Sequence, residues 1–430
     1  MEGACRRNPG TGNSGTGEKR KQYRAYRFRL YPDARQMEQM NRTFGCCRFL
    51  YNHMLADKIS FYQENHKMLR TTPARYKAEH EWLKEVDSLA LANVQLNLEA
   101  AYRNFFSDGK AGHPKFHAKH HCRDSFTTNM VNGNIRLSGT RLKLPKMDPV
   151  RIVVHRAVPE GGRLKSVTVT REPSGKYYAS LLYEADACEN QTGACLRADH
   201  VLGIDFAMDG LGVLSDGTRL DYPMFYRKAE EKLKKEQRKL SRCKKGSHNY
   251  DRQRRKLARA YEKTRNQRKD YQEKLSHHLA REYDAVAVED LDMRGMSGSL
   301  HFGKSVMDNA NGQFRRKLEE KLERNGKAFV KTGRFYPSSK RCSCCGKVKE
   351  SLLLSERVYR CECGNVMDRD WNAAVNIREE GIRLLGITCF IWLFRALSRK
   401  PPLQNLNRFK WWEPSQKAAK TMTHAAEKAF

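Results

Sequence analysis

The sequence predicts a multidomain α/β protein, in which a small β-barrel with a helical insertion precedes a second α/β region. Residues 23–30 and 124–187 carry strand-like apolar alternation, whereas 34–106 repeat apolar residues at helical spacing. From Val201 onward, short apolar strands are separated by helical stretches, and a dense cysteine cluster occupies 342–363. A chain of 430 residues has room for about two to four domains.

The charge balance is strongly one-sided. Lys and Arg number 82 against 49 Asp and Glu, which gives a formal net charge of +33. Solubility alone does not need such an excess, whereas a long polyanion would release counterions for each phosphate that is neutralised. The composition therefore predicts nucleic acid as the partner.

No membrane or secretory segment is expected. Residues 1–22 are rich in Gly, Ser, Arg and Lys without an apolar core, which predicts a disordered basic lead and not a signal peptide. The longest apolar run, Gly386–Leu397, is interrupted by Thr388 and Arg395 and is too short to span a bilayer. Five of the 13 cysteines lie between Cys342 and Cys363, a clustering that suggests metal ligation in a reducing compartment, and we expect the cytoplasm.

The first half of the chain predicts strands interrupted by helices. Tyr23–Leu30 alternates basic and apolar residues, as a half-buried strand with a basic outer face does. Pro32 and Asp33 end this strand, and helical spacing follows. Strand patterns return after Asp124, with a hairpin turn at 172–175. The early strand could join this later sheet, with the helices inserted between them.

The second half predicts an α/β sheet. Val201–Asp205 is a short apolar strand that ends in a carboxylate, and Ala285–Val288 is an apolar strand that runs into Glu289. Between them, Phe225–Tyr283 is a long helical stretch with Lys and Arg crowding one face. A further helix over 312–324 and a strand near Phe329 complete the pattern.

Three acidic residues stand where a two-metal site would need them. Asp205 and Glu289 end separate buried strands, and Asp370 opens a helix whose Ala373 and Ala374 can pack on the sheet. Two-metal phosphodiester hydrolysis uses convergent carboxylates to hold divalent ions about 3.5–4 Å apart, and Mg²⁺ prefers oxygen ligands. An RNase H-like sheet supplies such a geometry. The order of the acids therefore predicts a nuclease that uses two Mg²⁺ ions.

Neighbouring acids compete for these roles. Asp290 follows Glu289, but successive strand residues point to opposite faces, so only one of the two can enter the site. Asp368 precedes the helix of Asp370, and we expect it to cap that helix.

The cysteine cluster predicts a structural zinc site. Cys342-Ser-Cys-Cys345-Gly is a CxxCG knuckle, and Cys361-Glu-Cys363-Gly is a tighter CxCG knuckle. Two such pairs match one tetrahedral Zn²⁺ held by Cys342, Cys345, Cys361 and Cys363. Four thiolates leave no open coordination position, so this ion would be structural. We expect Cys344 to be a bystander.

Two basic segments are candidate phosphate-binding surfaces. Between Arg227 and Arg281, positive residues far outnumber acidic ones beside the predicted site. Residues 110–123 place Lys, His and Arg around Phe116. An aromatic ring among cations can stack on unpaired bases, but the sequence leaves open whether Phe116 is simply a core residue.

An ordered set of motifs over residues 23–380 resembles the TnpB family, the transposon-encoded relatives of type V CRISPR nucleases and of eukaryotic Fanzor proteins. The motifs are Tyr26-Arg-Phe-Arg-Leu-Tyr-Pro32, Phe44-Gly45, Arg48-Phe-Leu-Tyr-Asn52, Gly112-His-Pro-Lys-Phe116, Gly203-Ile-Asp205, Val288-Glu-Asp-Leu291, the two cysteine knuckles and Asp368-Arg-Asp-Trp-Asn-Ala-Ala374.

The resemblance implies an RNA-guided DNA endonuclease that cuts double-stranded target DNA beside a short target-adjacent motif. A guide RNA from the transposon end would pair with one DNA strand, while the protein holds the heteroduplex by its backbone. When bound to DNA, the protein would lie at the bacterial nucleoid. The oligomeric state stays open.

The resemblance also implies a domain plan. A wedge β-barrel would comprise 23–33 and 124–200, with a helical recognition domain inserted at 34–123. A RuvC-like, RNase H-fold nuclease domain would cover 201–380, with its zinc ribbon at about 334–366. The tail, 381–430, matches nothing in the family pattern, and its role is open.

Three alternatives remain at this stage. A nuclease-inactive, guide-dependent repressor of the same family would have lost RuvC acids, yet all three acids are present. A DDE-type transposase also uses three carboxylates, but a cysteine ribbon directly before the third acid argues against it. A non-catalytic zinc-ribbon RNA-binding protein would not cleave DNA with its RNA bound.

Overall fold

The computed structural model describes residues 21–109, 111–119, 123–159, 161–186, 196–207, 210–290, 310–353 and 355–387. The chain divides into two compact units, Met1–Cys188 and Glu189–Phe430. The predicted basic lead, except for its last two residues, and the tail after Ile387 lie outside the described residues. No described helix combines the length and apolar character needed to cross a membrane.

The first unit contains a seven-stranded antiparallel sheet in the order β2-β6-β7-β1-β5-β4-β3. Its strands are β1 (Lys21–Tyr31), β2 (Asp124–Asn129), β3 (Arg136–Ser138), β4 (Arg141–Leu144), β5 (Met147–Val153), β6 (Arg163–Arg171) and β7 (Tyr177–Asp186). The early strand does join the later sheet, because β1 pairs with both β7 and β5. Among the described strands, the edges β2 and β3 do not pair with each other. The sheet is therefore a half-barrel, which is the form that the predicted small β-barrel takes here.

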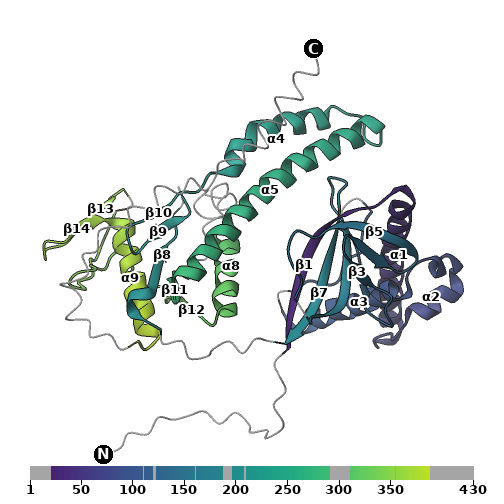
Figure 1. Ribbon diagram of the computed structural model, residues 1–430, viewed down its shortest axis with the longest axis horizontal. Coiled ribbons are helices and arrows are strands. Elements are labelled where there is room, and N and C mark those ends of the chain that lie inside the picture. The colour runs from purple at the N-terminus through teal and green to yellow at the C-terminus, as the bar shows by residue number, and fades with distance from the viewer. Residues whose placement is uncertain are drawn as a thin grey trace, which may run out of the picture. The chain divides into compact units, whose positions relative to one another are not determined.

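Helices inserted between β1 and β2 share the core of this sheet (Figure 1). They are α1 (Ala34–Asn65), α2 (Pro73–Glu79), the short 3₁₀ helix η1 (Glu81–Glu85) and α3 (Ser88–Ser107). Asp33 starts α1 through a capping box: its carboxylate accepts from the Gln36 backbone N–H at 2.8 Å, and the Gln36 side chain accepts from the Asp33 N–H. Leu50 and Leu98 from the helices lie in one buried cluster with Phe28 and Leu181 from the strands.

The second unit is built on a five-stranded sheet in the order β10-β9-β8-β11-β12. It comprises β8 (Val201–Asp205), preceded by the 3₁₀ turn η2 (Ala198–His200), then β9 (Gly212–Leu214), β10 (Arg219–Leu220), β11 (Ala285–Val288) and β12 (Ala328–Lys331). Strands β8, β11 and β12 are parallel, whereas β9 and β10 are antiparallel additions. The first strand in sequence is thus central, as the RNase H-like expectation requires, and the region is RuvC-like.

Helices cover both faces of this sheet (Figure 1). On one face, α5 (His248–Glu282) and α8 (Asn311–Arg324) bury Leu275 and Phe314 against Leu202 and Val286. On the other face, α9 (Arg369–Leu384) lies directly on β8 and β11. A Cβ on Gly203 would fall 2.2 Å from the Ala374 carbonyl oxygen, so only glycine allows this approach.

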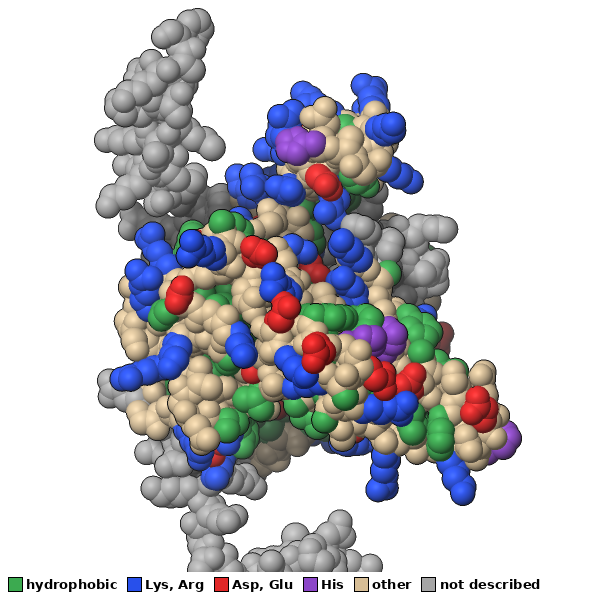
Figure 2. Space-filling view, turned by 90° about the vertical axis from the view of Figure 1, so that its right-hand side faces the viewer, with side chains coloured by type: hydrophobic (Ala, Val, Ile, Leu, Met, Phe, Trp, Pro, Cys, Tyr) green, Lys and Arg blue, Asp and Glu red, His purple; other side chains and the backbone are tan. Residues whose placement is uncertain are grey.

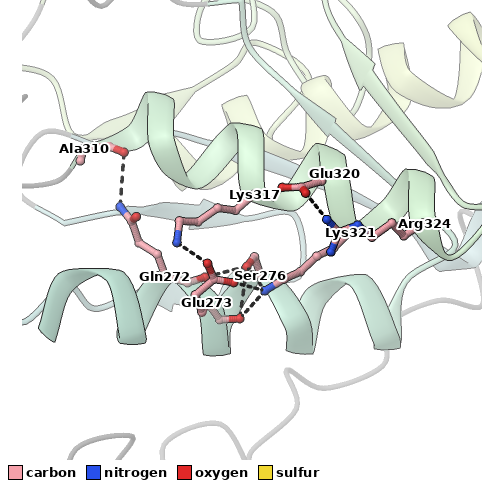
Figure 3. A network of polar contacts seen from close by, with 8 residues as sticks. All are labelled: Gln272, Glu273, Ser276, Ala310, Lys317, Glu320, Lys321 and Arg324. Carbon is pink, nitrogen blue, oxygen red and sulfur yellow. Dashed lines mark hydrogen bonds and ion pairs between the residues drawn. The ribbon is translucent and has the colours of Figure 1, made fainter. Parts of the chain in front are cut away.

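A polar network fastens α5 to α8 (Figure 3). The Glu273 carboxylate pairs with Lys317 Nζ at 2.6 Å and with Lys321 Nζ at 2.9 Å, and Lys321 also donates to Ser276 Oγ at 2.8 Å. The Gln272 side chain donates to the Ala310 carbonyl at 3.3 Å, directly before α8 begins. Burial alone would raise the pKa of Glu273, but the hydrogen bonds and positive charges of Lys317 and Lys321 lower it to about 2.

The long helical stretch predicted for 225–283 is two helices, α4 (Phe225–Ser241) and α5, which pack as a hairpin (Figure 1). Gly246 turns the chain with φ of 81°, and Ser247 then caps α5 by accepting from the Tyr250 N–H at 3.1 Å. The Gln253 side chain donates to the Glu236 carbonyl at 3.1 Å and joins the two helices.

Candidate active site and cysteine cluster

Asp205, Glu289 and Asp370 approach one another at the carboxyl ends of the parallel strands. Asp205 ends β8, Glu289 directly follows β11, and Asp370 lies in the first turn of α9. Side chains alternate along a strand, and both Gly203 on β8 and Ala287 on β11 face α9. Two residues farther along each chain, Asp205 and Glu289 therefore lie on the face that carries Asp370.

The electrostatics of Asp205 reflect this proximity. Burial raises the pKa of Asp205 well above its usual range, and the negative charges of Glu289 and Asp370 raise it further. Arg369 opposes this effect, and its Nε lies 3.4 Å from Asp370 Oδ1. The Ser338 hydroxyl donates to Glu289 Oε1 at 2.6 Å and orients that carboxylate.

The competing acids have structural partners instead. Asp290 lies 3.4 Å from Arg315 of α8, on the opposite face from α9, so the two neighbouring carboxylates point to opposite faces of the sheet. Asp368 caps α9, because its Oδ1 accepts from the N–H groups of Asp370 and Trp371 at 3.1 and 3.0 Å. The capping role predicted for Asp368 is thus confirmed.

The acid cluster fits divalent cations. It gathers hard oxygen donors from three elements around a buried carboxylate, and the mutual repulsion of the acids is what a divalent ion would relieve. These residues are therefore compatible with Mg²⁺.

The four predicted cysteines form one cluster. The sulfur atoms of Cys342, Cys345, Cys361 and Cys363 all lie within 4.8 Å of one another, and Cys344 is not part of this group. The strands β13 (Val358–Arg360) and β14 (Val366–Asp368) form a hairpin around the second knuckle. Gly346 and Gly364 adopt φ values of 79° and 85°, which closes each knuckle at the position where glycine is favoured.

The thiol environment fits zinc. Burial alone would raise the pKa of Cys342, but hydrogen bonds from the backbone N–H groups of Cys345 and Cys344 lower it to about 6. A thiolate is the form that ligates a metal. Four sulfur donors in a group this compact match the tetrahedral structural zinc site that the spacing predicted.

Two asparagines that the sequence interpretation passed over connect the cysteine cluster to the acids. Asn372 and Asn376 are buried on α9, directly after Asp370. The Asn376 side chain donates to the carbonyls of Ser338 and Arg341 at 2.8 and 2.6 Å, and Asn372 donates to Arg341 and accepts from the Ser343 N–H. Asparagine is a poor residue for a helix interior, so two asparagines at i and i+4 were the sequence feature that could have revealed this role.

The α4–α5 hairpin carries exposed positive charge at its end. Blue side chains crowd the corresponding upper projection in Figure 2. The exposed cations of the hairpin end are Arg242, Lys244, Lys245, Arg252, Arg255 and Lys256. Asp251 is the one acid between Arg242 and Lys256. This surface suits a phosphate backbone.

The second basic segment presents its aromatic ring to solvent. Phe116 is 57% exposed, so it is not a core residue. The following residue anchors it: the His117 ring stacks on Tyr51 at 3.9 Å between ring centroids, and the His117 N–H donates to Asn52 Oδ1 at 2.8 Å.

Three family models match parts of the chain. Residues 188–300 match a family described as "Probable transposase", and residues 312–377 match the "Cas12f1-like, TNB domain". Residues 22–67 match a "Helix-turn-helix domain", although the structure forms the strand β1 and the single helix α1 there.

Relatives cover most of the chain. A Streptomyces pristinaespiralis protein described as "Putative RNA-guided DNA endonuclease" is 33% identical over 373 residues, which cover 84% of this chain and 89% of the relative. Escherichia coli (strain K12) has a relative, "Putative RNA-guided DNA endonuclease InsQ", that is 29% identical over 89% of this chain and 98% of its own length. A mimivirus relative described as a TnpB-like protein is 29% identical over 30% of this chain and 25% of its own.

One solved structure has the same fold. The protein in the cryo-EM structure of a Cas12f1-sgRNA-target DNA complex aligns with a TM-score of 0.50 and 13% identity, over 80% of this chain and 82% of that one.

Proposed function

Because this chain belongs to the TnpB family of RNA-guided DNA endonucleases, we propose that it cuts double-stranded target DNA next to a short target-adjacent motif, guided by an RNA from the transposon end. The convergence of Asp205, Glu289 and Asp370 on one face of the sheet carries the proposal. The proposed reaction is hydrolysis of a phosphodiester with two Mg²⁺ ions.

The three carboxylates would hold those ions. When bound, the ions would lower the pKa of the attacking water and stabilise charge on the departing oxygen. Asp205, buried on β8, would hold the ions together with Glu289 and Asp370, whose charges already act on it. Ser338 would keep Glu289 in its rotamer through the 2.6 Å hydrogen bond.

Zn²⁺ at Cys342, Cys345, Cys361 and Cys363 would serve structure alone. Four thiolates would leave no position for water. A ribbon with so little apolar core would fold only with its ion. The hydrogen bonds of Asn372 and Asn376 would then hold α9 against the folded ribbon.

The positive surfaces would bind the phosphate backbone of the nucleic acid, while base pairing between the guide RNA and the DNA selects the target sequence. In the family plan, residues 23–33 and 124–200 would act as the wedge domain, 34–123 as the recognition domain and 201–380 as the nuclease. The exposed end of the α4–α5 hairpin and the Phe116 segment are the surfaces on this chain that suit such contacts.

The test is a guide swap. RNA that copurifies with the full chain is sequenced, its guide segment is replaced, and DNA that matches the new guide is supplied beside the unchanged target-adjacent motif. We expect Mg²⁺-dependent cleavage to move to the new site, with mismatches near the motif reducing it most. Cleavage at a fixed sequence regardless of the guide would contradict RNA guidance while leaving the nuclease chemistry intact.

A further inference from the structure

Phe335 is the most exposed large apolar side chain among the described residues, at 92% of its full surface. It lies in the loop that follows β12. Exposing a whole aromatic ring to water is unfavourable, and an isolated exposed ring usually needs no explanation. The surroundings of Phe335 set it apart from such a case.

The loop around Phe335 is held on both sides. The Thr332 N–H donates to the Val288 carbonyl at 2.9 Å, directly before Glu289. After the ring, the Tyr336 hydroxyl donates to the Asn376 carbonyl of α9 at 3.2 Å, and the Ser338 carbonyl accepts from the Asn376 side chain at 2.8 Å. The loop is therefore anchored on both sides, and the Phe335 ring stands in solvent between the anchors.

This support is part of the acid site. The carboxyl ends of β8, β11 and β12 share one edge of the sheet because these strands are parallel. Arg334, directly before the ring, has a guanidinium nitrogen 4.0 Å from Asp290, and Ser338, three residues after it, donates to Glu289. In the sequence the exposed ring thus lies between Arg334, which contacts Asp290 on the α8 side, and Ser338, which contacts Glu289 of the acid cluster.

The charge of the segment identifies what can cover the ring. Residues 331–341 contain Lys331, Arg334, Lys340 and Arg341 and no Asp or Glu. Cations around an exposed aromatic ring complement a strand of nucleic acid, whose phosphates meet the cations while a base stacks on the ring. Paired bases are already stacked on their neighbours, so the ring can accept only a base that has left the duplex.

We propose that Phe335 is a substrate-binding residue, which stacks on an unpaired base of the DNA strand next to the phosphate being cut. This inference rests on the proposed nuclease function and adds to it a stacking contact that holds the DNA strand against Asp205, Glu289 and Asp370. The stacked base fixes the strand on one side of the scissile phosphate, so the cut falls at a defined distance from the ring.

The test uses the RNA-bound full chain and a DNA target that the wild-type complex cuts, with 2-aminopurine placed beside the mapped cut. Ca²⁺ replaces Mg²⁺ during the fluorescence measurement to hold back cleavage. We expect quenching in the wild-type complex, loss of quenching in Phe335→Ala, and its return in Phe335→Trp. With Mg²⁺, Phe335→Ala should cut roughly 10- to 100-fold more slowly and at scattered positions, with the affinity for guide RNA unchanged.

Phe106→Ala is the matched control, because Phe106 is 67% exposed at the end of α3 in the other unit. It should leave both the quenching and the cut position unchanged. Wild-type cleavage and quenching in Phe335→Ala would overturn the stacking role. A wild-type complex that cuts no DNA at all would instead refute the proposed function, so the two failures are distinguishable.

Discussion

The cysteine cluster and the acid cluster are assembled by different routes. The four thiols come from one short stretch, Cys342 to Cys363, and two tight knuckles bring their sulfur atoms within 4.8 Å of one another. The acids are spread from Asp205 to Asp370 and meet only because β8 and β11 are parallel neighbours and α9 lies across them. A local site depends on its turns, whereas a distributed site depends on the whole sheet.

The two clusters nevertheless share α9. Asp370 belongs to the acid site, and Asn372 and Asn376 of the same helix bind the backbone that leads into the first cysteine knuckle. Damage to the acids should therefore leave the zinc cluster intact, whereas damage to the cysteines should spread to the acids.

Substitution of an acid in the acid cluster should have the largest effect on DNA cleavage. Asp370→Ala should reduce DNA cleavage by on the order of 10³-fold or more, because several kcal/mol of metal-dependent stabilisation would be lost. Zinc content and RNA binding should stay at the wild-type level. Single-turnover cleavage, elemental analysis and an RNA-binding titration measure the three.

Asp368→Asn is the matched control for Asp370, since it keeps a helix-capping side chain two residues away. It should retain substantial activity. Wild-type cleavage by Asp370→Ala would remove Asp370 from the metal site.

Breaking the cysteine side should affect both clusters. Cys361→Ser should reduce bound zinc well below the expected one ion per chain and unfold the ribbon. Cleavage should fall by roughly 100-fold, because an unfolded ribbon no longer offers the backbone of Arg341 and Ser343 to Asn372 and Asn376 of α9. Elemental analysis measures the bound zinc, and limited proteolysis of residues 340–370 measures the unfolding of the ribbon.

Cys344→Ser provides the comparison, because Cys344 is exposed and outside the sulfur cluster. It should keep full zinc content. A Cys361→Ser protein that keeps its zinc and its proteolytic resistance would contradict the assigned ligand set.

The connection between the clusters can be tested by itself. Asn376→Ala removes hydrogen bonds of 2.8 and 2.6 Å to Ser338 and Arg341, and loss of such support typically costs about 10- to 100-fold in activity. Zinc should remain bound. The fall should be in kcat and not in KM. The Mg²⁺ concentration needed to saturate cleavage should be lower than in Asp370→Ala.

Arg383→Ala changes the same helix at an exposed position, where Arg383 pairs with Glu380. It should cleave DNA normally. Equal losses in Asn376→Ala and Arg383→Ala would mean that general weakening of α9, and not the ribbon contact, causes the defect.

The smallest effect concerns the α5–α8 network. The pKa of Glu273 is lowered from 4.5 to about 2, so its stabilising contribution is present above pH about 4.5 and is lost as the pH falls toward about 2. Because the side chain is 42% exposed, we expect about 1 kcal/mol or less after solvent screening.

Glu273→Gln should therefore unfold more easily than the wild type at pH 7, and the difference should shrink as the pH is lowered below about 4.5. Urea titrations at several pH values measure it. Glu320→Gln, which changes an exposed partner of Arg324 within α8, should show a smaller difference at every pH. A stability gap that widens in acid would reverse the assigned direction.

The sequence by itself determined the features that depend on neighbouring residues. The alternation of 23–30 specified β1, Pro32 and Asp33 marked its end, and the cysteine spacing specified the four-cysteine cluster. Capping by Asp368 was also predictable, because a cap acts only on the adjoining helical turn. Local geometry suffices for each of these.

Tertiary structure alone decided the rest. It directed Asp290 toward α8 and away from α9, left the half-barrel open between β2 and β3, and divided the expected helical stretch into the two helices of the α4–α5 hairpin. It also buried Asn376 while leaving Phe335 in solvent. Each of these outcomes depends on which distant segment packs against a residue, and no local pattern encodes the identity of that segment.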